Sequence, residues 1–183
     1  MRHSVFGQRV DPVGSGCRAR LELGDAAAAD VTATIGQILV GYAERGFLLG
    51  VSAPVLTPSG AEYKIVWHGI RSLQVVLDRK RSTLAFPHLL PRIAAASPMY
   101  KDLRNFVRAF GSSRKPAHRR INPDKGTLTC RNRRGTVAVV IGVHDGDFDY
   151  ATRRLLNVAH EIFMVFLADG PYSDYDITEL GDA

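Results

Sequence analysis

The sequence predicts an α+β domain in which helices cover one face of an antiparallel sheet. Two kinds of apolar spacing support this fold class. Apolar residues recur at the helical period in the helix segments, whereas shorter segments alternate apolar and polar residues as half-buried strands do. The predicted order is one helix, three or four strands, a helix, two strands and a final helix. With 183 residues, of which 45% are hydrophobic, the chain can bury a core without a metal or disulfide.

Three regions divide the chain. Residues 1–24 mix glycine, proline and arginine without a period, which predicts a flexible or loosely packed N-terminal extension. Residues 25–168 hold the predicted domain, and residues 169–183 form an acidic C-terminal tail. No apolar run approaches the ~20 residues that span a bilayer. The basic start also lacks the apolar centre of a secretory signal, so we expect a cytoplasmic protein with no membrane partner.

The first predicted helix begins at a cap formed by Asp25 or Asp30. Apolar residues recur at helical spacing from Val31 to Tyr42 and form one stripe. Gly46 then ends the helix, since glycine readily adopts the left-handed conformation found after helix C-termini.

Extended segments follow this helix. The first is 47–56, where Pro54 has no N–H for a ladder and therefore predicts a sheet edge or a bulge. Two alternating strands are predicted at 62–68 and 72–78. A short further strand is expected to end at Pro87.

The second helix has start and stop signals in the sequence. Ser97 is the predicted cap, Pro98 the first helical residue and Gly111 the end. A hairpin follows over 127–143, with its turn at or near the letters NRRG and a second strand that is apolar enough to be central. The final helix is predicted from about Phe148 to Ala168.

This succession of elements resembles the secretion-chaperone-like α+β architecture, in which helices cover one face of a twisted antiparallel sheet. The resemblance lies in element order alone, covers residues 25–168 and involves no sequence motif. It implies an adaptor- or chaperone-like domain that binds a protein or peptide partner.

Motifs for catalysis and nucleotide binding are missing from the sequence. It contains no GxSxG, no GK[ST] phosphate loop and no GxGxxG after a strand. His160 and Glu161 could begin an HExxH zinc motif, but Met164 stands where the second histidine is required. We therefore predict no catalytic residue, cofactor or metal. An enzyme whose site is dispersed along the chain is the third functional alternative.

The stretch HDGDFDY at 144–150 places three aspartates at alternate positions, namely Asp145, Asp147 and Asp149. A calcium loop would require glycine and glutamate where this chain has Tyr150 and Leu156. Acids at the start of a helix accept hydrogen bonds from its free N–H groups and favour the positive end of its dipole. We therefore expect a capping role, with Asp149 also paired to Arg153.

Positive charge is concentrated in one segment. In a chain of net charge +6, the residues from Arg114 to Arg134 include eight Lys or Arg and one acid, Asp124. Clustered cations of this kind bind phosphates, so the second functional alternative is binding of nucleic acid or another polyanion. Its predicted residues are Arg114, Lys115, Arg119, Arg120, Arg131, Arg133 and Arg134. The acidic tail could instead neutralise this segment, within the chain or across a dimer.

The last helix is apolar on every side over its second half, 162–167. A helix of this kind is either deeply buried or covered by a partner. Because a single sheet with helices on one face offers little room for full burial, we predict a homodimer. Its interface would contain Ile162, Phe163, Phe166 and Leu167, with the two phenylalanines on different surfaces. The favoured function is thus a non-enzymatic, dimeric domain that binds a protein or peptide.

Overall fold

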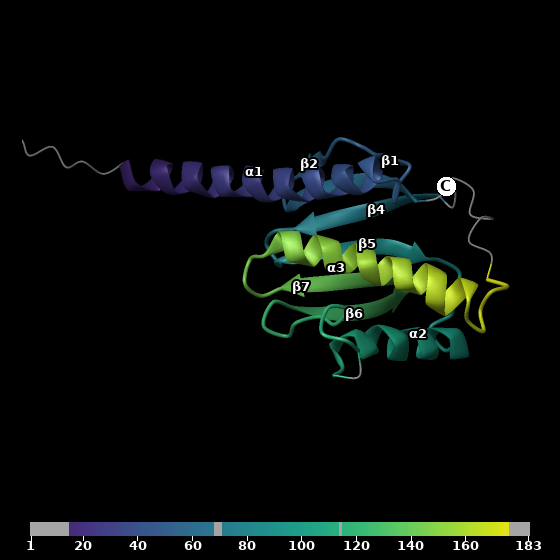
Figure 1. Ribbon diagram of the computed structural model, residues 1–183. Coiled ribbons are helices and arrows are strands. Elements are labelled where there is room, and N and C mark those ends of the chain that lie inside the picture. The colour runs from purple at the N-terminus through teal and green to yellow at the C-terminus, as the bar shows by residue number, and fades with distance from the viewer. Residues whose placement is uncertain (1–14, 68–70, 114, 176–183) are drawn as a thin grey trace, which may run out of the picture.

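The computed structural model describes residues 15–67, 71–113 and 115–175, with side chains from Asp30 onward apart from Arg71. Within these ranges it confirms the α+β fold, with three helices and a seven-stranded antiparallel sheet (Figure 1). None of the described helices combines the length and the apolar composition that crossing a membrane requires.

The elements follow the predicted order. The first half of the chain contains α1 (Ser15–Glu44), β1 (Gly50–Val51), β2 (Val55–Thr57), β3 (Gly60–Trp67), β4 (Arg71–Asp78) and β5 (Thr83–Leu90). The second half contains α2 (Pro98–Arg108), a 3₁₀ turn (Ala109–Gly111), β6 (Gly126–Arg133), β7 (Thr136–Val143) and α3 (Phe148–Glu161), which continues as a π-helix (Ile162–Ala168).

The sheet has the order β1-β3-β4-β5-β7-β6, and β2 pairs with β3 beside β1. Strand β7 alternates half-exposed and buried residues along its whole length, which shows that one face of the sheet is covered. The helices lie on that face, with α1 next to β1 and β3, α3 over β5 and β7, and α2 beside β6 (Figure 1). The predicted central strand is therefore internal, but only one of its faces is deeply buried.

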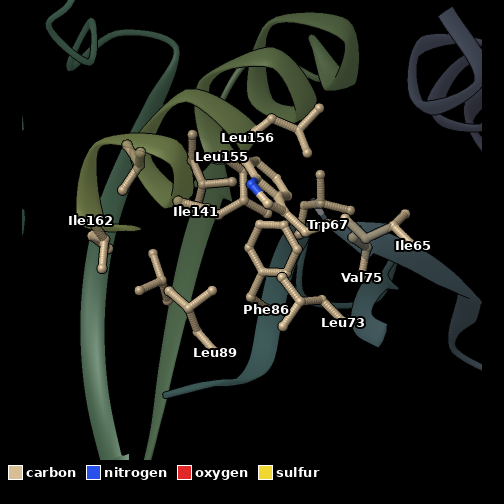
Figure 2. Close-up of a cluster of buried hydrophobic side chains, with 14 of the residues drawn as sticks. Ile65, Trp67, Leu73, Val75, Phe86, Leu89, Ile141, Leu155, Leu156 and Ile162 are labelled. Atoms are coloured by element: carbon tan, nitrogen blue, oxygen red, sulfur yellow. The ribbon is translucent and has the colours of Figure 1, made fainter. Parts of the chain in front are cut away.

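The core lies between the sheet and α3. Trp67 and Phe86 project from the sheet toward Leu155 and Leu156 of α3, as Figure 2 shows. The ring of Trp67 also lies 5.8 Å from that of Phe163, measured between centroids. Aromatic and aliphatic side chains from distant strands thus hold α3 against the sheet.

Helix α1 begins earlier than predicted. It starts at Ser15, upstream of both expected caps, Asp25 and Asp30, so part of the expected 1–24 extension is helical. Leucine, glutamate and alanine are strong helix formers and are frequent over 21–29, which outweighs the cost of Gly24. The predicted stop is confirmed, since Gly46 has a φ of +76°. Residues 1–14 lie outside the described ranges.

The two strand prolines have different outcomes. Pro54 lies where the outer edge is interrupted between β1 and β2, as predicted. Pro87 does not end β5, which continues to Leu90, so that prediction was wrong. The pairing of β5 with β7 instead shifts register between Phe86 and Leu90, which allows the strand to pass a residue that cannot donate to the ladder.

The apolar end of the last helix is buried within the chain itself. Four side chains that we assigned to a dimer interface face the core and are not available as a surface: Ile162, Phe163, Phe166 and Leu167. Burial is achieved because α1 and α2 flank α3, with the ring of Phe166 5.4 Å from that of Phe106. The outward-facing residues are Met164 and Val165, which are 47% and 46% exposed.

We expect Phe86→Ala to lower the free energy of unfolding by about 3–5 kcal/mol, because it removes a side chain that is 1% exposed and leaves a cavity. Urea denaturation followed by circular dichroism measures the change. Val66→Ala is the control, since Val66 is 38% exposed and its loss should cost less than ~1 kcal/mol. Equal losses in the two variants would contradict the placement of the core.

Candidate functional site

The predicted basic residues form two groups at opposite ends of β6. Lys115, Arg119 and Arg120 lie in the loop between α2 and β6, whereas Arg131 and Arg133 lie on β6. Arg134 is in the turn to β7. At a rise of about 3.3 Å per residue, Arg131 and Arg133 lie roughly 17–23 Å along β6 from the residue where the loop enters the strand. Arg114 lies outside the described ranges. The structure therefore does not unite these residues in one polyanion site.

Two of the loop cations are already paired. The Nζ of Lys115 lies 2.5 Å from Oε2 of Glu161, and Nη2 of Arg119 lies 2.9 Å from the same oxygen. Glu161 is 9% exposed, and Lys115 also lies over the ring of Phe110, 3.9 Å from its centroid. These cations neutralise a buried carboxylate instead of facing a ligand, which corrects the role that the sequence suggested for them.

The acidic stretch at 144–150 caps α3, as predicted. Oδ1 of Asp147 accepts a hydrogen bond from the N–H of Tyr150 at 2.9 Å, and its Oδ2 lies 2.5 Å from Nζ of Lys125. Asp149 pairs with Arg153 at 2.7 Å. Over the described ranges, no group of three or more His, Cys, Asp or Glu residues is arranged to hold a metal ion.

A groove of about 560 Å³ lies between α2 and β6. On the strand side it is lined by five consecutive residues, 126–130. Successive side chains of a strand point to opposite faces of the sheet. A groove that touches all five residues must therefore run along the outer edge of β6.

The main chain of β6 offers hydrogen bonds along this edge. His144 donates its N–H to the carbonyl of Lys125 at 3.0 Å, so Lys125, which directly precedes β6, bonds toward β7. In an antiparallel ladder, every second residue of a strand bonds to the same neighbour. The N–H and C=O groups of Leu128 and Cys130, which belong to the other set, are therefore directed away from β7. The register is set by a two-residue turn in which Arg134 and Gly135 have φ values of 52° and 82°. No other strand in the described part of the chain pairs with β6 on its outer side.

The groove is positively charged. Arg104 and Arg108, one turn apart on α2, line it, and no carboxylate lines it among the residues that the structure describes. Both arginines are exposed, and sequence reasoning did not place them beside β6. The available signal was their spacing of four residues, which puts both on one face of α2.

Cys130 also lines the groove. Burial raises the pKa of its thiol to about 11, an effect that the nearby Arg104 only partly offsets. The thiol therefore stays protonated at neutral pH, where the thiolate is the reactive form. The groove is thus chemically suited to binding through main-chain hydrogen bonds and positive charge.

We expect Asp147→Ala to lower the melting temperature at pH 7, with a cost of about 1 kcal/mol for the lost helix cap. The hydrogen bond from Lys125, followed by that from the Tyr150 N–H, lowers the pKa of Asp147 in the folded chain. Its stabilisation is therefore complete above the ordinary carboxyl pKa of about 3.9 and is lost as the pH falls through the lower folded value. The difference in melting temperature between wild type and variant should shrink accordingly in acid.

Asp149→Ala is the control for this measurement, because it removes an exposed pair worth only ~0.3–0.5 kcal/mol. Added divalent metal should not raise the melting temperature of the wild type. Equal melting temperatures of wild type and Asp147→Ala at pH 7 would contradict the capping role.

No family model, curated protein or solved structure matches this chain. The resemblance in element order to secretion chaperones consequently gains no support from these comparisons.

Proposed function

We propose that this protein binds an extended, acidic segment of a partner protein, which adds as a further strand to β6. The observation that carries this proposal is that the outer edge of β6 borders a groove whose other wall holds two arginines. An open strand edge pairs readily with another extended chain, and β-strand addition is a common mode of peptide recognition.

The groove supplies both the main-chain hydrogen bonds and the side-chain contacts that recognition by strand addition requires. The outward N–H and C=O groups of Leu128 and Cys130 can bond to the main chain of an added strand. Alternate side chains of that strand would face α2, where Arg104 and Arg108 offer charge. The partly buried Leu128 of β6 offers apolar surface in the same groove. The volume of about 560 Å³ lies within the range of roughly 300–1,000 Å³ that is usual for ligand sites. The ligand that fits best alternates apolar and acidic residues.

Binding of a polyanion is the second candidate function. Arg131, Arg133 and Arg134 are exposed, and none of them has a carboxylate partner in the described part of the chain. Contacts of this kind with phosphates give affinity that falls steeply with salt and depends little on sequence. The raised pKa of Cys130 argues against a thiolate nucleophile in the groove, so the enzyme alternative receives no support there.

A homodimer remains a prediction, as does the cytoplasmic location. What supports a dimer is exposed apolar surface at the other edge of the sheet, where Val55 and Leu56 of β2 are 64% and 73% exposed. We expect sedimentation equilibrium at tens of micromolar to report a dimer that Leu56→Glu dissociates. A monomeric wild type under these conditions would remove the proposal.

The groove is tested by fluorescence anisotropy with a labelled ten-residue peptide of alternating glutamate and valine. We expect Arg104→Glu/Arg108→Glu to weaken binding at least tenfold, about 1.4 kcal/mol, because two attractive charges become repulsive. The control Lys64→Glu/Lys80→Glu makes the same change in net charge at exposed positions that do not line the groove. It should bind nearly as the wild type does.

A second variant, Cys130→Pro, tests strand addition itself. Proline at this position removes an outward N–H without removing a hydrogen bond between β6 and β7, a placement that edge strands tolerate. Binding should be lost while the melting temperature stays close to that of the wild type. Unchanged peptide affinity in both variants would contradict the proposed function. Heparin binding with a steep salt slope that is lost in Arg131→Ala/Arg133→Ala/Arg134→Ala would instead establish the second candidate.

A further inference from the structure

A second pocket, separate from the groove along β6, lies between the 115–125 loop and the first turns of α3. Its volume is about 350 Å³, and three cationic side chains line it: Arg120, Lys125 and Arg154. The remaining lining residues in the described part of the chain include Tyr150 and Asn122, but no carboxylate. An anion in this pocket would therefore meet positive charge from both the loop and the helix.

Two of these three charges are not balanced within the described part of the chain. Lys125 has two acids, Asp147 at 2.5 Å and Asp145 at 3.6 Å. Arg120 and Arg154 have no carboxylate partner in that part of the chain, although both are half-buried. Partial burial of a charge costs free energy unless an opposite charge or hydrogen bonds compensate it. The pocket thus presents two guanidinium charges that a bound dianion would neutralise.

The pocket is held in shape by contacts around Tyr150. Its hydroxyl accepts a hydrogen bond from the N–H of Asn122 at 2.7 Å and donates to the carbonyl of Arg120 at 3.5 Å. Lys125 Nζ and Arg154 Cζ lie 5.2 Å and 5.1 Å from the centroid of the Tyr150 ring. A cationic site that is already ordered loses less conformational entropy when its ligand binds.

The backbone of the loop is also fixed from the side of α3. Nη1 of Arg154 donates to the carbonyl of His118, which ties the loop to the helix within one residue of Arg119. Arg154 therefore has two roles, since one part of its guanidinium positions the loop and the rest remains available to a ligand. Arginine can do this because its planar group carries five N–H donors.

We propose that this pocket binds the phosphate group of a small ligand. A phosphate group carries a charge of about −1.5 to −2 at neutral pH, which can be neutralised by the two uncompensated guanidinium groups. Arginine binds phosphate oxygens through paired N–H donors, and such charge-assisted hydrogen bonds are stronger than neutral ones. The volume of about 350 Å³ is at the lower end of the usual ligand-site range of roughly 300–1,000 Å³, so a small phosphate ester fits as well as free phosphate.

Isothermal titration calorimetry with inorganic phosphate and with ribose 5-phosphate, each at constant ionic strength, tests this site. We expect Arg120→Gln and Arg154→Gln each to weaken binding at least tenfold. The matched control is Arg153→Gln, which changes the neighbouring residue, whose charge is already paired with Asp149 at 2.7 Å. It should bind as the wild type does.

The two ligands distinguish the source of the phosphate. Tighter binding of ribose 5-phosphate identifies an organic phosphate ester, and equal binding identifies the phosphate group alone; either outcome supports the site. Arg154 also holds the loop through its bond to the carbonyl of His118, so Arg154→Gln could be unstable. In that case Arg120→Gln still tests the site, because no hydrogen bond of the Arg120 side chain holds the loop in the described part of the chain. No binding of either ligand, or an equal loss in Arg153→Gln, would overturn the proposal. The phosphate titrations do not depend on whether a peptide binds in the groove, so the two proposals can fail separately.

Discussion

The arrangement of both candidate sites depends on one buried carboxylate. Glu161 lies inside the helix layer and accepts Lys115 and Arg119 from the loop that joins α2 to β6. A buried ion pair of this kind adds little net stability compared with apolar packing, yet loss of one partner is costly because the other charge remains buried. The contribution of Glu161 is therefore mainly geometric, since it decides where the loop lies against α3.

That loop forms a wall of both pockets. Ile121 and Pro123 line the groove beside β6, while Arg120, Asn122 and again Pro123 line the pocket beside α3. A segment without regular secondary structure can serve two sites only if it is held at several points. Here the ion pairs with Glu161 hold one end, and the hydrogen bonds of Tyr150 hold the middle. Functional loops are commonly positioned by a rigid scaffold in this way.

Features that depend on near neighbours in the sequence were predictable. Ser97 caps α2 through a residue three positions away, and Asp147 does the same for α3. The role of Lys115 was not predictable, because its partner Glu161 is 46 residues further along the chain. The groove was missed for a similar reason. An alternating strand has the same sequence pattern at an edge as inside a sheet, so the open edge of β6 emerges only from the pairing of all the strands.

The position of Trp67 makes the fold easy to follow in solution. It is the only tryptophan in the sequence and is buried beneath α3, where the rings of His160 and Phe163 lie 6.4 Å and 5.8 Å from its own. Indole emission shifts to longer wavelength when water reaches the ring. The intrinsic fluorescence of this protein therefore reports, from one site and without a label, whether the helix that carries Tyr150, Arg154 and Glu161 is docked on the sheet.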